Sequence, residues 1–311
     1  MTYDLAIIGG GPAGVAAGIY AARKRLKTIF ITKDFEGQSS VSLDIQNWIG
    51  TVTISGADLA SNLEKHLRSY EGEILDIKKG EWVQKLSKSS NLENPNGFTI
   101  TTDAGSYDAH TVLITAGSRR RKLEVPGAAE YDNKGITYCA SCDGPLFADM
   151  DVTVIGGGNA AFDTAAQLLA YCKTVTLLAR GDFRADPATI EKTLQNPKFK
   201  AFKNTELVKI SGDKFVSGLT YKNETGEIVE FPTKGVFAEI GSLPNTDFVK
   251  DFISLDKYNH IVTDPRNQRT SVEGVWAAGD VTDGLYQQNN IAAGDAIKAL
   301  EDLYLKLHLT K

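Results

Sequence analysis

Two of the chain's three cysteines, Cys139 and Cys142, are separated by two residues, and Asp143 follows them directly. A Cys-x-x-Cys pair can close a small disulfide that thiolate attack reopens, so this spacing suits a redox-active centre. The alternative is half of a zinc site. Zinc needs four ligands, however, and the remaining cysteine, Cys172, and the four histidines are scattered along the chain. We therefore favour redox chemistry and expect no metal site.

Asp143 is the group beside the cysteine pair that can exchange protons with it. A carboxylate in this place can give or take a proton as thiols form and are consumed. The alternative is a local role, as a turn residue before Gly144. Cys172 falls in an expected helix, and we interpret it as a packed core cysteine.

A glycine-rich turn follows the first apolar run of the chain. Residues 5–8 predict a short buried parallel strand, which leads into Gly9, Gly11 and Gly14 and then a helix over about 12–25. In the G-x-G-x-x-G pattern the glycines permit a tight turn, close approach to a pyrophosphate and close packing of helix on strand. The helix N-terminus then faces the phosphate charge, so the pattern predicts a dinucleotide site.

A second strand is expected over 28–32, which completes a β-α-β unit. An acid after this strand would normally bind a ribose hydroxyl. Asp34 can serve in this role, and so can Thr32 together with the backbone, and the sequence leaves the choice open.

The same order of strand, glycine turn, helix and strand returns in the middle of the chain. Residues 151–155 are apolar, Gly156, Gly158 and Ala161 form the turn, a helix extends to about residue 172, and 174–178 is a strand. Two such units in one chain imply two dinucleotides, and the duplication is far more specific than either copy alone.

The other patterns place supporting elements around these two units. The stretch 37–50 is polar and interpreted as a surface loop, and the basic run 119–122 as a solvated linker, with docking of an acidic partner as its alternative. In the first half we expect an amphipathic helix over 57–70 and antiparallel strands over 73–113 with a turn at 94–97. In the second half we expect strands over 205–240 with a turn at 223–226, followed by a return linker at 241–245. The last elements are a strand from 274 that ends in Gly279-Asp280 and a helix over 289–305.

Length and composition agree with a soluble protein of two domains. The chain has 311 residues, of which 42% are hydrophobic and 23% charged. A net charge of −5 gives no reason to expect nucleic acid or an anionic membrane as a partner. We find no signal peptide or membrane span in the sequence and expect a cytoplasmic location.

The order of the motifs resembles that of the low-molecular-weight thioredoxin reductases, and the likeness covers the whole chain. It rests on G-x-G-x-x-G from Gly9, Gly37-Gln38, Asn47-Trp48-x-Gly50, Cys139-x-x-Cys142-Asp143-Gly144, Gly156-x-Gly158-x-x-Ala161 and Ala277-Ala278-Gly279-Asp280-Val281. The resemblance implies an α/β fold of two three-layer, Rossmann-like dinucleotide-binding domains. An FAD domain of residues 1–117 and 246–311 would carry the second domain, residues 118–245, as an insertion.

The resemblance also implies the cofactor sites. FAD would contact Gly9, Gly11, Pro12, Ala13, Gly14, Gly37, Gln38, Asn47, Gly279 and Asp280, with Val83 near the adenine. The family's Arg-Gln-Ala after the Gly-Asp pair reads Gln287-Gln288-Asn289, so Gln288 matches and its neighbours alter the surroundings of the flavin pyrimidine ring. The helix that begins there would stabilise negative charge on the reduced flavin.

The nicotinamide site departs further from the family. NADPH would bind Gly156, Gly158, Asn159 and Ala160, with its 2′-phosphate held by Arg180 and Arg184. NADPH-linked members have His-Arg-Arg-x-x-Phe-Arg, whereas Ala179 replaces the histidine here, the second arginine is either replaced by Gly181 or deleted, and the spacing from Arg180 to Arg184 is one residue short. Asp182 adds a negative charge. NADPH is the favoured donor, and NADH, ferredoxin or a second flavin are the alternatives.

The resemblance implies a homodimeric, flavin-dependent disulfide reductase whose two domains rotate between flavin-reducing and substrate-reducing arrangements. Electrons would pass from FAD to the Cys139–Cys142 disulfide and on to thioredoxin or a thioredoxin-like protein. Cys142 would lie nearer the flavin, Cys139 would attack the partner's disulfide, and Asp143 would be the acid/base group. The alternatives are a reductase independent of pyridine nucleotides, a dithiol oxidase that uses oxygen, and a redox sensor without turnover.

Overall fold

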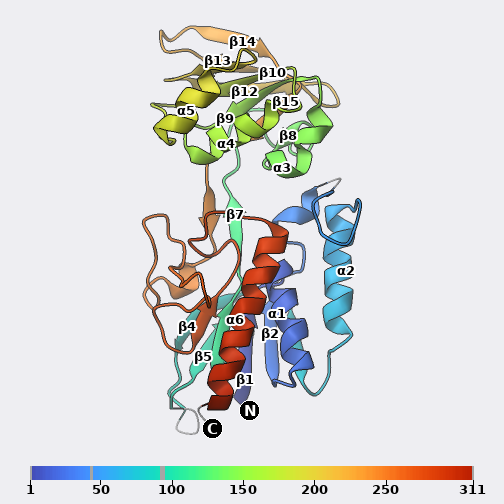
Figure 1. Cartoon of the computed structure of the whole chain (residues 1–311), viewed down its shortest axis with the longest axis vertical. Helices are drawn as coiled ribbons and strands as arrows, with labels where there is room; N and C mark the ends of the chain where they lie inside the picture. The colour runs from blue at the N-terminus through green and yellow to red at the C-terminus, as the bar shows by residue number, and fades with distance from the viewer. Residues whose placement is uncertain (1, 43–44, 92–94, 310–311) are drawn as a thin grey trace.

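Two sheets, the first mixed and the second parallel, are each covered by helices and form two units stacked along the long axis of the molecule (Figure 1). The computed structural model describes residues 2–42, 45–91 and 95–309. An antiparallel ribbon of β7 (Ser118–Arg120) and β16 (Ser242–Pro244) joins the two units. The chain leaves the first unit along one strand of this ribbon and returns along the other. This confirms the predicted insertion of one Rossmann-like unit into another.

The first unit, here called the flavin unit, is built on a sheet with the order β3-β2-β1-β6-β5-β4, in which β17 also pairs with β6. β1, β2, β3, β6 and β17 are parallel, and β5 is antiparallel to both its neighbours. β17 joins the segment that follows the ribbon to this sheet. The bounds are β1 (Thr2–Ile8), β2 (Thr28–Thr32), β3 (Leu75–Lys79), β4 (Val83–Lys88), β5 (Phe98–Thr102), β6 (Ser106–Ile114) and β17 (Val275–Ala277).

Helices α1 (Pro12–Arg23) and α6 (Asn289–Leu309) pack side by side on one face of this sheet, and α2 (Gly56–Arg68) flanks α1 (Figure 1). Small residues make the close approach possible: a Cβ on Gly18 of α1 would lie 2.5 Å from Leu67 of α2. Aliphatic residues from the segment after η3 (Asp247–Val249) bury the opposite face. The hydrophobic effect thus drives three layers together around the sheet.

The second unit, here called the inserted unit, has a parallel sheet of the order β11-β10-β9-β15-β8. Apolar residues of the helices fill one face, and an antiparallel sheet of β12, β13 and β14 covers the other. The bounds are β8 (Ile136–Thr137), α3 (Ala140–Asp143), η2 (Gly144–Phe147), β9 (Asp151–Ile155), α4 (Asn159–Leu168), β10 (Thr174–Leu178), α5 (Pro187–Leu194), β11 (Phe199–Phe202), β12 (Glu206–Gly212), β13 (Val216–Lys222), β14 (Ile228–Pro232) and β15 (Gly235–Ala238).

Most local predictions are confirmed. The strands over 28–32, 151–155 and 174–178 have the predicted bounds, and the helix after residue 289 is present. The turn at 223–226 is closed by a hydrogen bond of 2.9 Å from the Gly226 amide to the Asn223 carbonyl. Cys172 is fully buried in the core of the inserted unit, where burial raises its pKa to about 11. It lies beyond the end of α4 rather than within a helix.

Three predictions need correction. β3 pairs in parallel with β2, because α2 serves as the crossover that returns the chain in the same direction. Part of the polar stretch 37–50 forms a short 3₁₀ helix, η1 (Gln38–Val41), that contributes to the site described below. The start of the basic run is a paired strand of the ribbon rather than a solvated linker.

Three further features complete the fold. The predicted turn at 94–97 includes residues outside the described part of the chain. α5 and β11 had no counterpart among the predicted elements. Across the described residues, the helices are too short or too polar for any of them to cross a lipid bilayer.

Candidate functional site

The first glycine turn is shaped by close backbone packing. Gly9 has a φ of 119°, and a Cβ there would lie 2.3 Å from the Thr115 carbonyl oxygen. A Cβ on Gly14 would lie 1.9 Å from the carbonyl oxygen of Gly9. These two glycines therefore let β1, α1 and the end of β6 meet. At Gly11, the N-cap of α1, a Cβ would meet nothing within 4 Å, so the free amides of the helix face open space.

That open space is a cavity of about 890 Å³ beside the carboxyl ends of β1, β2 and β6. Residues from the glycine turn, from η1, from β4 and from the segment after β17 line it. Ten of the predicted FAD contacts are among them: Gly9, Gly11, Pro12, Ala13, Gly37, Gln38, Val83, Gly279, Asp280 and Asn289. The cradle at Gly11 and the uncapped helix amides fit a pyrophosphate, as a dinucleotide requires.

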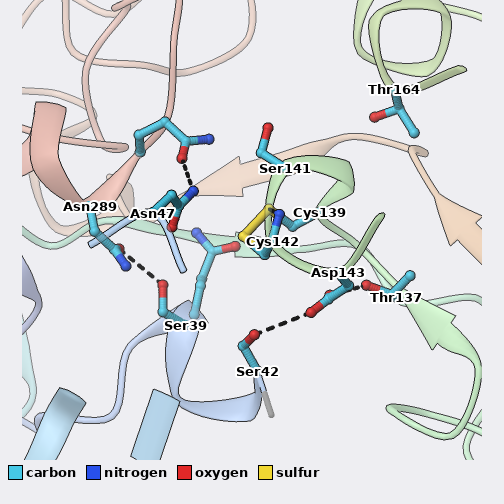
Figure 2. The surroundings of a disulfide bond; sticks show 12 residues. Ser39, Ser42, Asn47, Thr137, Cys139, Ser141, Cys142, Asp143, Thr164 and Asn289 are labelled. Atoms are coloured by element: carbon cyan, nitrogen blue, oxygen red, sulfur yellow. Dashed lines mark hydrogen bonds between the residues drawn. A yellow bond between two sulfur atoms is a disulfide. The ribbon is translucent and has the colours of Figure 1, made fainter. Parts of the chain in front are cut away.

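The other predicted FAD residues, where described, lie outside this lining. Gly14 supports the turn from behind, and Gln287 is exposed. The side-chain amide of Asn47 donates a hydrogen bond of 3.2 Å to the side-chain oxygen of Gln288, and this bond ties two loops together. Asn289 accepts a hydrogen bond of 2.9 Å from the Ser39 hydroxyl, which fixes η1 against the start of α6 (Figure 2).

The two candidates for binding a ribose hydroxyl differ in the hydrogen bonds they already make. Asp34 and Thr32 both line the cavity, but the Thr32 hydroxyl donates to the Asp34 carbonyl oxygen at 2.5 Å. The Asp34 carboxylate accepts from the Glu36 amide at 3.1 Å and retains oxygen lone pairs for another donor. Asp34 is therefore the better placed of the two to accept a hydrogen bond from a ligand.

A network of polar side chains closes the cavity toward the ribbon. The Gln38 amide donates to the Ser118 hydroxyl at 2.9 Å and to the Asp280 carboxylate at 3.2 Å, and its oxygen accepts from the Arg120 guanidinium at 2.9 Å. Burial raises the pKa of Asp280, while the charge of Arg120 opposes this rise. Sequence reasoning missed Arg120 because a basic run gives no sign that one of its members bonds to the flavin unit.

The inserted unit presents the cysteine pair on a short helix. Cys139 and Cys142 form a disulfide, and Cys139 is the N-cap of α3 (Figure 2). The Cys142 amide donates to the Cys139 sulfur at 3.2 Å, which favours a thiolate at Cys139 once the disulfide is opened. Both cysteines are half-buried. Ser39, Asn47 and Asn289 of the flavin unit belong to the surroundings of the disulfide (Figure 2).

Asp143 lies at the end of the same helix and touches both units. Its carboxylate accepts hydrogen bonds from the hydroxyl of Thr137 and, at 3.2 Å, from the hydroxyl of Ser42 (Figure 2). The first donor belongs to the inserted unit and the second to the flavin unit. The predicted pair of Cys139–Cys142 with Asp143 is therefore brought together, and two further hydroxyls join it that the sequence did not indicate.

The second glycine turn repeats the design of the first. Gly156 has a φ of 151°, and a Cβ there would lie 2.3 Å from the Glu239 carbonyl oxygen. Gly158 faces open space as the N-cap of α4, and Asn159 and Ala160 are exposed at the helix start. This cradle also fits a pyrophosphate.

The loop after β10 is fixed to this turn by its backbone. The Arg184 amide donates to the Gly157 carbonyl at 2.7 Å, and the Asp186 amide donates to the Asn159 side chain at 2.8 Å. Both predicted clamp residues, Arg180 and Arg184, are exposed on the loop.

A buried carboxyl lies beneath the turn. Burial raises the pKa of Glu239 to about 7, and the Thr164 hydroxyl donates to its carboxylate at 2.8 Å. The charge of Arg120 acts in the opposite direction, as it does at Asp280.

The fold and this site define a flavin- and nucleotide-binding disulfide oxidoreductase. Residues 3–296 match the family model described as pyridine nucleotide-disulphide oxidoreductase, and the chain belongs to that family, which binds FAD and uses NAD(P)H.

Two of the curated relatives are an NADH dehydrogenase and a component of alkyl hydroperoxide reductase. The chain is 36% identical over 299 residues to "NADH dehydrogenase" of Bacillus subtilis and 37% identical over 300 residues to the F component of alkyl hydroperoxide reductase of Xanthomonas campestris. These matches cover 96% of the chain but 57% and 56% of the two relatives, so the chain spans little more than half of their length.

Solved structures of similar length are thioredoxin reductases. The enzyme of Streptococcus pyogenes has 34% identity and a TM-score of 0.88, with 99% of this chain and 98% of that chain covered. The enzyme of Giardia duodenalis has 30% identity and a TM-score of 0.90, with 99% of both chains covered. The resemblance to the low-molecular-weight thioredoxin reductases that the motifs indicated is thereby confirmed.

The cradle can be tested at Gly14. We expect Gly14→Ala to reduce the flavin retained on purification severalfold, because its Cβ would collide with the Gly9 carbonyl at 1.9 Å and shift the turn. The measurement is the ratio of flavin to protein absorbance, together with titration of the stripped protein with FAD. Gly294→Ala in α6 is the matched control, since a Cβ there meets nothing within 4 Å. Full flavin content in Gly14→Ala would contradict the close packing described.

Proposed function

We propose that this protein is a disulfide reductase that passes electrons from FAD through the Cys139–Cys142 disulfide to thioredoxin or a thioredoxin-like protein. The observation that carries the proposal is the position of the disulfide. It lies on the face of the inserted unit that meets the flavin unit, where Ser42 of the flavin unit reaches Asp143 at 3.2 Å. A redox pair placed beside the cavity can be reduced there and then act on another disulfide.

The two domains can be assigned on the same basis. We propose that residues 1–117 and 246–311 bind FAD and that residues 118–245 bind the nicotinamide nucleotide and carry the redox pair. The ribbon of β7 and β16 marks both crossings of the chain. FAD, when bound, supplies a two-electron carrier. The residues that line the cavity would hold it by the cradle at Gly11 and the carboxylates of Asp34 and Asp280.

We propose different roles for the two sulfurs. Cys142 would accept the electrons from the flavin side, and Cys139, favoured as a thiolate by the Cys142 amide, would attack the partner's disulfide. In that exchange a Cys139–partner bond forms and the partner's disulfide breaks. Cys142 then attacks the mixed disulfide, which restores the Cys139–Cys142 bond and releases the reduced partner. Asp143 would return protons to the leaving sulfurs.

Access to a partner requires the units to move, because both cysteines are half-buried against the flavin unit. A comparison supports such a motion. Lactococcus lactis thioredoxin reductase in its FR conformation has 31% identity and covers 97% of this chain, yet its TM-score is 0.66. The Streptococcus pyogenes enzyme, at similar identity and coverage, reaches 0.88. A whole-chain score falls in this way when two units keep their folds but change their relative placement.

The proposal is tested by Cys142→Ser. We expect this variant to retain FAD, because Cys142 does not line the cavity, but to lose electron flow to thioredoxin by more than ~100-fold, since one sulfur cannot form the disulfide. The measurement is thioredoxin reduction after photoreduction of the bound flavin without oxygen. Ser141→Ala, a change between the two cysteines, is the control. Normal turnover in Cys142→Ser would show that the pair is not the relay, and turnover of a dithiol with oxygen alone would favour the oxidase.

The electron donor is proposed to be NADPH, bound at the second glycine turn, with NADH and ferredoxin as the competing donors. Anaerobic mixing with each reductant while flavin absorbance is followed identifies the donor directly. The turn provides the pyrophosphate cradle, while the 2′-phosphate depends on the side chains of the loop after β10.

Gly181→Arg tests the clamp. The site has room, since a Cβ on Gly181 would meet nothing within 4 Å. A charged hydrogen bond to the 2′-phosphate is worth about 1.5–3 kcal/mol, so we expect the Kd for NADPH to fall about tenfold or more. The Kd for NADH should not change. Gly181→Gln, of similar length without the charge, is the control, and equal gains for both nucleotides would contradict a phosphate clamp.

We also propose that the protein is a homodimer through its flavin unit. The most exposed large apolar side chains, with exposed fractions of 74% to 90%, lie on the two loops that Asn47 and Gln288 tie together: Ile49, Val52, Leu285 and Tyr286. An apolar patch of this kind is typical of a protein interface.

The dimer is tested by sedimentation. We expect Leu285→Ser combined with Val52→Ser to shift the protein toward monomer, because two apolar anchors are lost from the interface. Phe215→Ser, at an apolar side chain 63% exposed on the inserted unit, is the control and should leave the state unchanged. A wild-type monomer at micromolar concentration would refute the homodimer.

A further inference from the structure

The carboxylate of Asp143 is held by hydroxyl groups from both units. Thr137, on β8 beside the cysteine pair, donates to Oδ2, and Ser42, from the end of η1, donates to Oδ1 at 3.2 Å (Figure 2). Thr137 is buried, with an exposed fraction of 6%. Each oxygen of the proposed acid/base group therefore has a donor, and the two donors lie on opposite sides of the boundary between the units.

Ser42 is fixed within the flavin unit by its backbone. Its amide donates to the Ser39 carbonyl at 3.1 Å, and its carbonyl accepts from the Gly56 amide at 2.8 Å, at the start of α2. A Cβ on Gly56 would lie 1.8 Å from the Ser39 carbonyl oxygen, so this segment rests directly on the helix terminus. The Ser42 hydroxyl is thus presented to Asp143 by a tightly packed segment.

Thr137 and Asp143 are fixed within the inserted unit. Thr137 pairs with Phe237 in the parallel sheet, and the Asp143 amide donates to the Cys139 carbonyl at 3.0 Å. Thr137, Cys139 and Asp143 therefore move together as one piece when the units change their placement. Ser42 stays behind with the flavin unit.

Opening the disulfide requires protons as well as electrons. The sulfur–sulfur bond breaks as two electrons enter from the reduced flavin, and two protons convert the thiolates to thiols. When the pair later reduces a partner, two electrons pass to the partner's disulfide bond, which breaks, and the partner's sulfurs take up protons. The Cys139–Cys142 bond forms again. A carboxyl group that serves both steps must be oriented in both placements of the units.

We propose that Thr137 and Ser42 are positioning residues for Asp143, and that Ser42 acts only in the step in which the cysteine pair faces the flavin cavity. This inference rests on the proposed function. Thr137 orients the carboxylate in both half-reactions because it travels with Asp143. Ser42 completes the site in the reductive half-reaction and is absent from it when the pair meets a partner protein. The acid/base group is thereby coupled to the placement of the units.

The test measures the two half-reactions separately in the holoprotein. In the first, the flavin is photoreduced without oxygen and the opening of the disulfide is followed by alkylation of the thiols. In the second, the pair is reduced beforehand with a dithiol, which is then removed. Stoichiometric exchange with 5,5′-dithiobis-(2-nitrobenzoate) is followed, and this exchange needs no electrons from the flavin.

Three variants and one control distinguish the roles. We expect Ser42→Ala to slow disulfide opening about tenfold, a part of the effect of an oriented acid, and to leave the exchange unchanged. Thr137→Val should slow both half-reactions, and Thr137→Ser, which keeps the hydroxyl, should restore both. Ser40→Ala removes a neighbouring hydroxyl that donates to the Gly37 carbonyl, and it should match the wild type.

The outcomes separate this inference from the proposed function. If Ser42→Ala matches Ser40→Ala in both half-reactions, or slows both equally, the role of Ser42 is refuted. Failure of Thr137→Ser to restore the rates lost in Thr137→Val would refute the role of the Thr137 hydroxyl. If the wild-type protein itself does not move electrons from flavin to the cysteine pair, the proposed function fails instead.

Discussion

A single pair of sulfurs cannot touch two partners at once. Thiol–disulfide exchange and transfer from a flavin both need contact between the reacting groups, and Cys139 and Cys142 lie on a short helix that faces the flavin unit. The structure meets this constraint by placing the pair on a separate unit joined by a narrow ribbon. Among the described residues, direct side-chain hydrogen bonds across the boundary include Ser42 to Asp143 and the ribbon residue Arg120 to Gln38. Each hydrogen bond of this kind makes a small net contribution to stability, so it can be broken and remade when the units move.

The Arg120 guanidinium is a positive charge near two acidic side chains at the boundary between the units. Burial raises the pKa of Glu239, on the inserted unit, and of Asp280, on the flavin unit, and the charge of Arg120 on the ribbon opposes both shifts. The Arg120 guanidinium also lies 5.7 Å from the centre of the Tyr138 ring, just before Cys139. The Arg120 cation on the ribbon is therefore close to an acidic side chain of each unit.

Local features of the fold could be read from the sequence, and features that depend on distant pairing could not. The two glycine turns and the strands that precede them could be predicted because each motif lies within one short segment, although the carbonyls that a Cβ at Gly9 or Gly156 would strike belong to the distant residues Thr115 and Glu239. The direction of β3 depends on α2 as a crossover, and nothing within its own residues encodes it. Its alternation of apolar Leu75 and Ile77 with polar Asp76 and Lys78 suits an antiparallel strand equally well.

The candidate site divides in the same way. The cysteine pair, Asp143 and most of the flavin cradle follow from motifs of fixed spacing. Arg120, Ser42 and Thr137 carry no such signal, because an arginine in a basic run, a serine in a polar loop and a threonine on a strand are ordinary on the surface or in a sheet. The proposed role of Ser42 and the bond of Arg120 to Gln38 depend on distant segments that meet in the fold, about a hundred residues apart for Ser42 and Asp143. Thr137 lies close to Asp143 in sequence, but its residue type gives no sign of the contact.

The second glycine turn shows how the backbone and the side chains of a nucleotide site can diverge. The loop after β10 is fixed by its main chain, through the Arg184 amide on Gly157 and the Asp186 amide on Asn159. These bonds do not depend on the side chains at 180–182. The negative charge of Asp182 is itself met by Lys203 at 3.1 Å. In nucleotide sites of this design a pyrophosphate binds the glycine cradle, whereas a 2′-phosphate is recognised by cations on the following loop, so under the proposed function loss of an arginine there would change which nucleotide is preferred without removing the site.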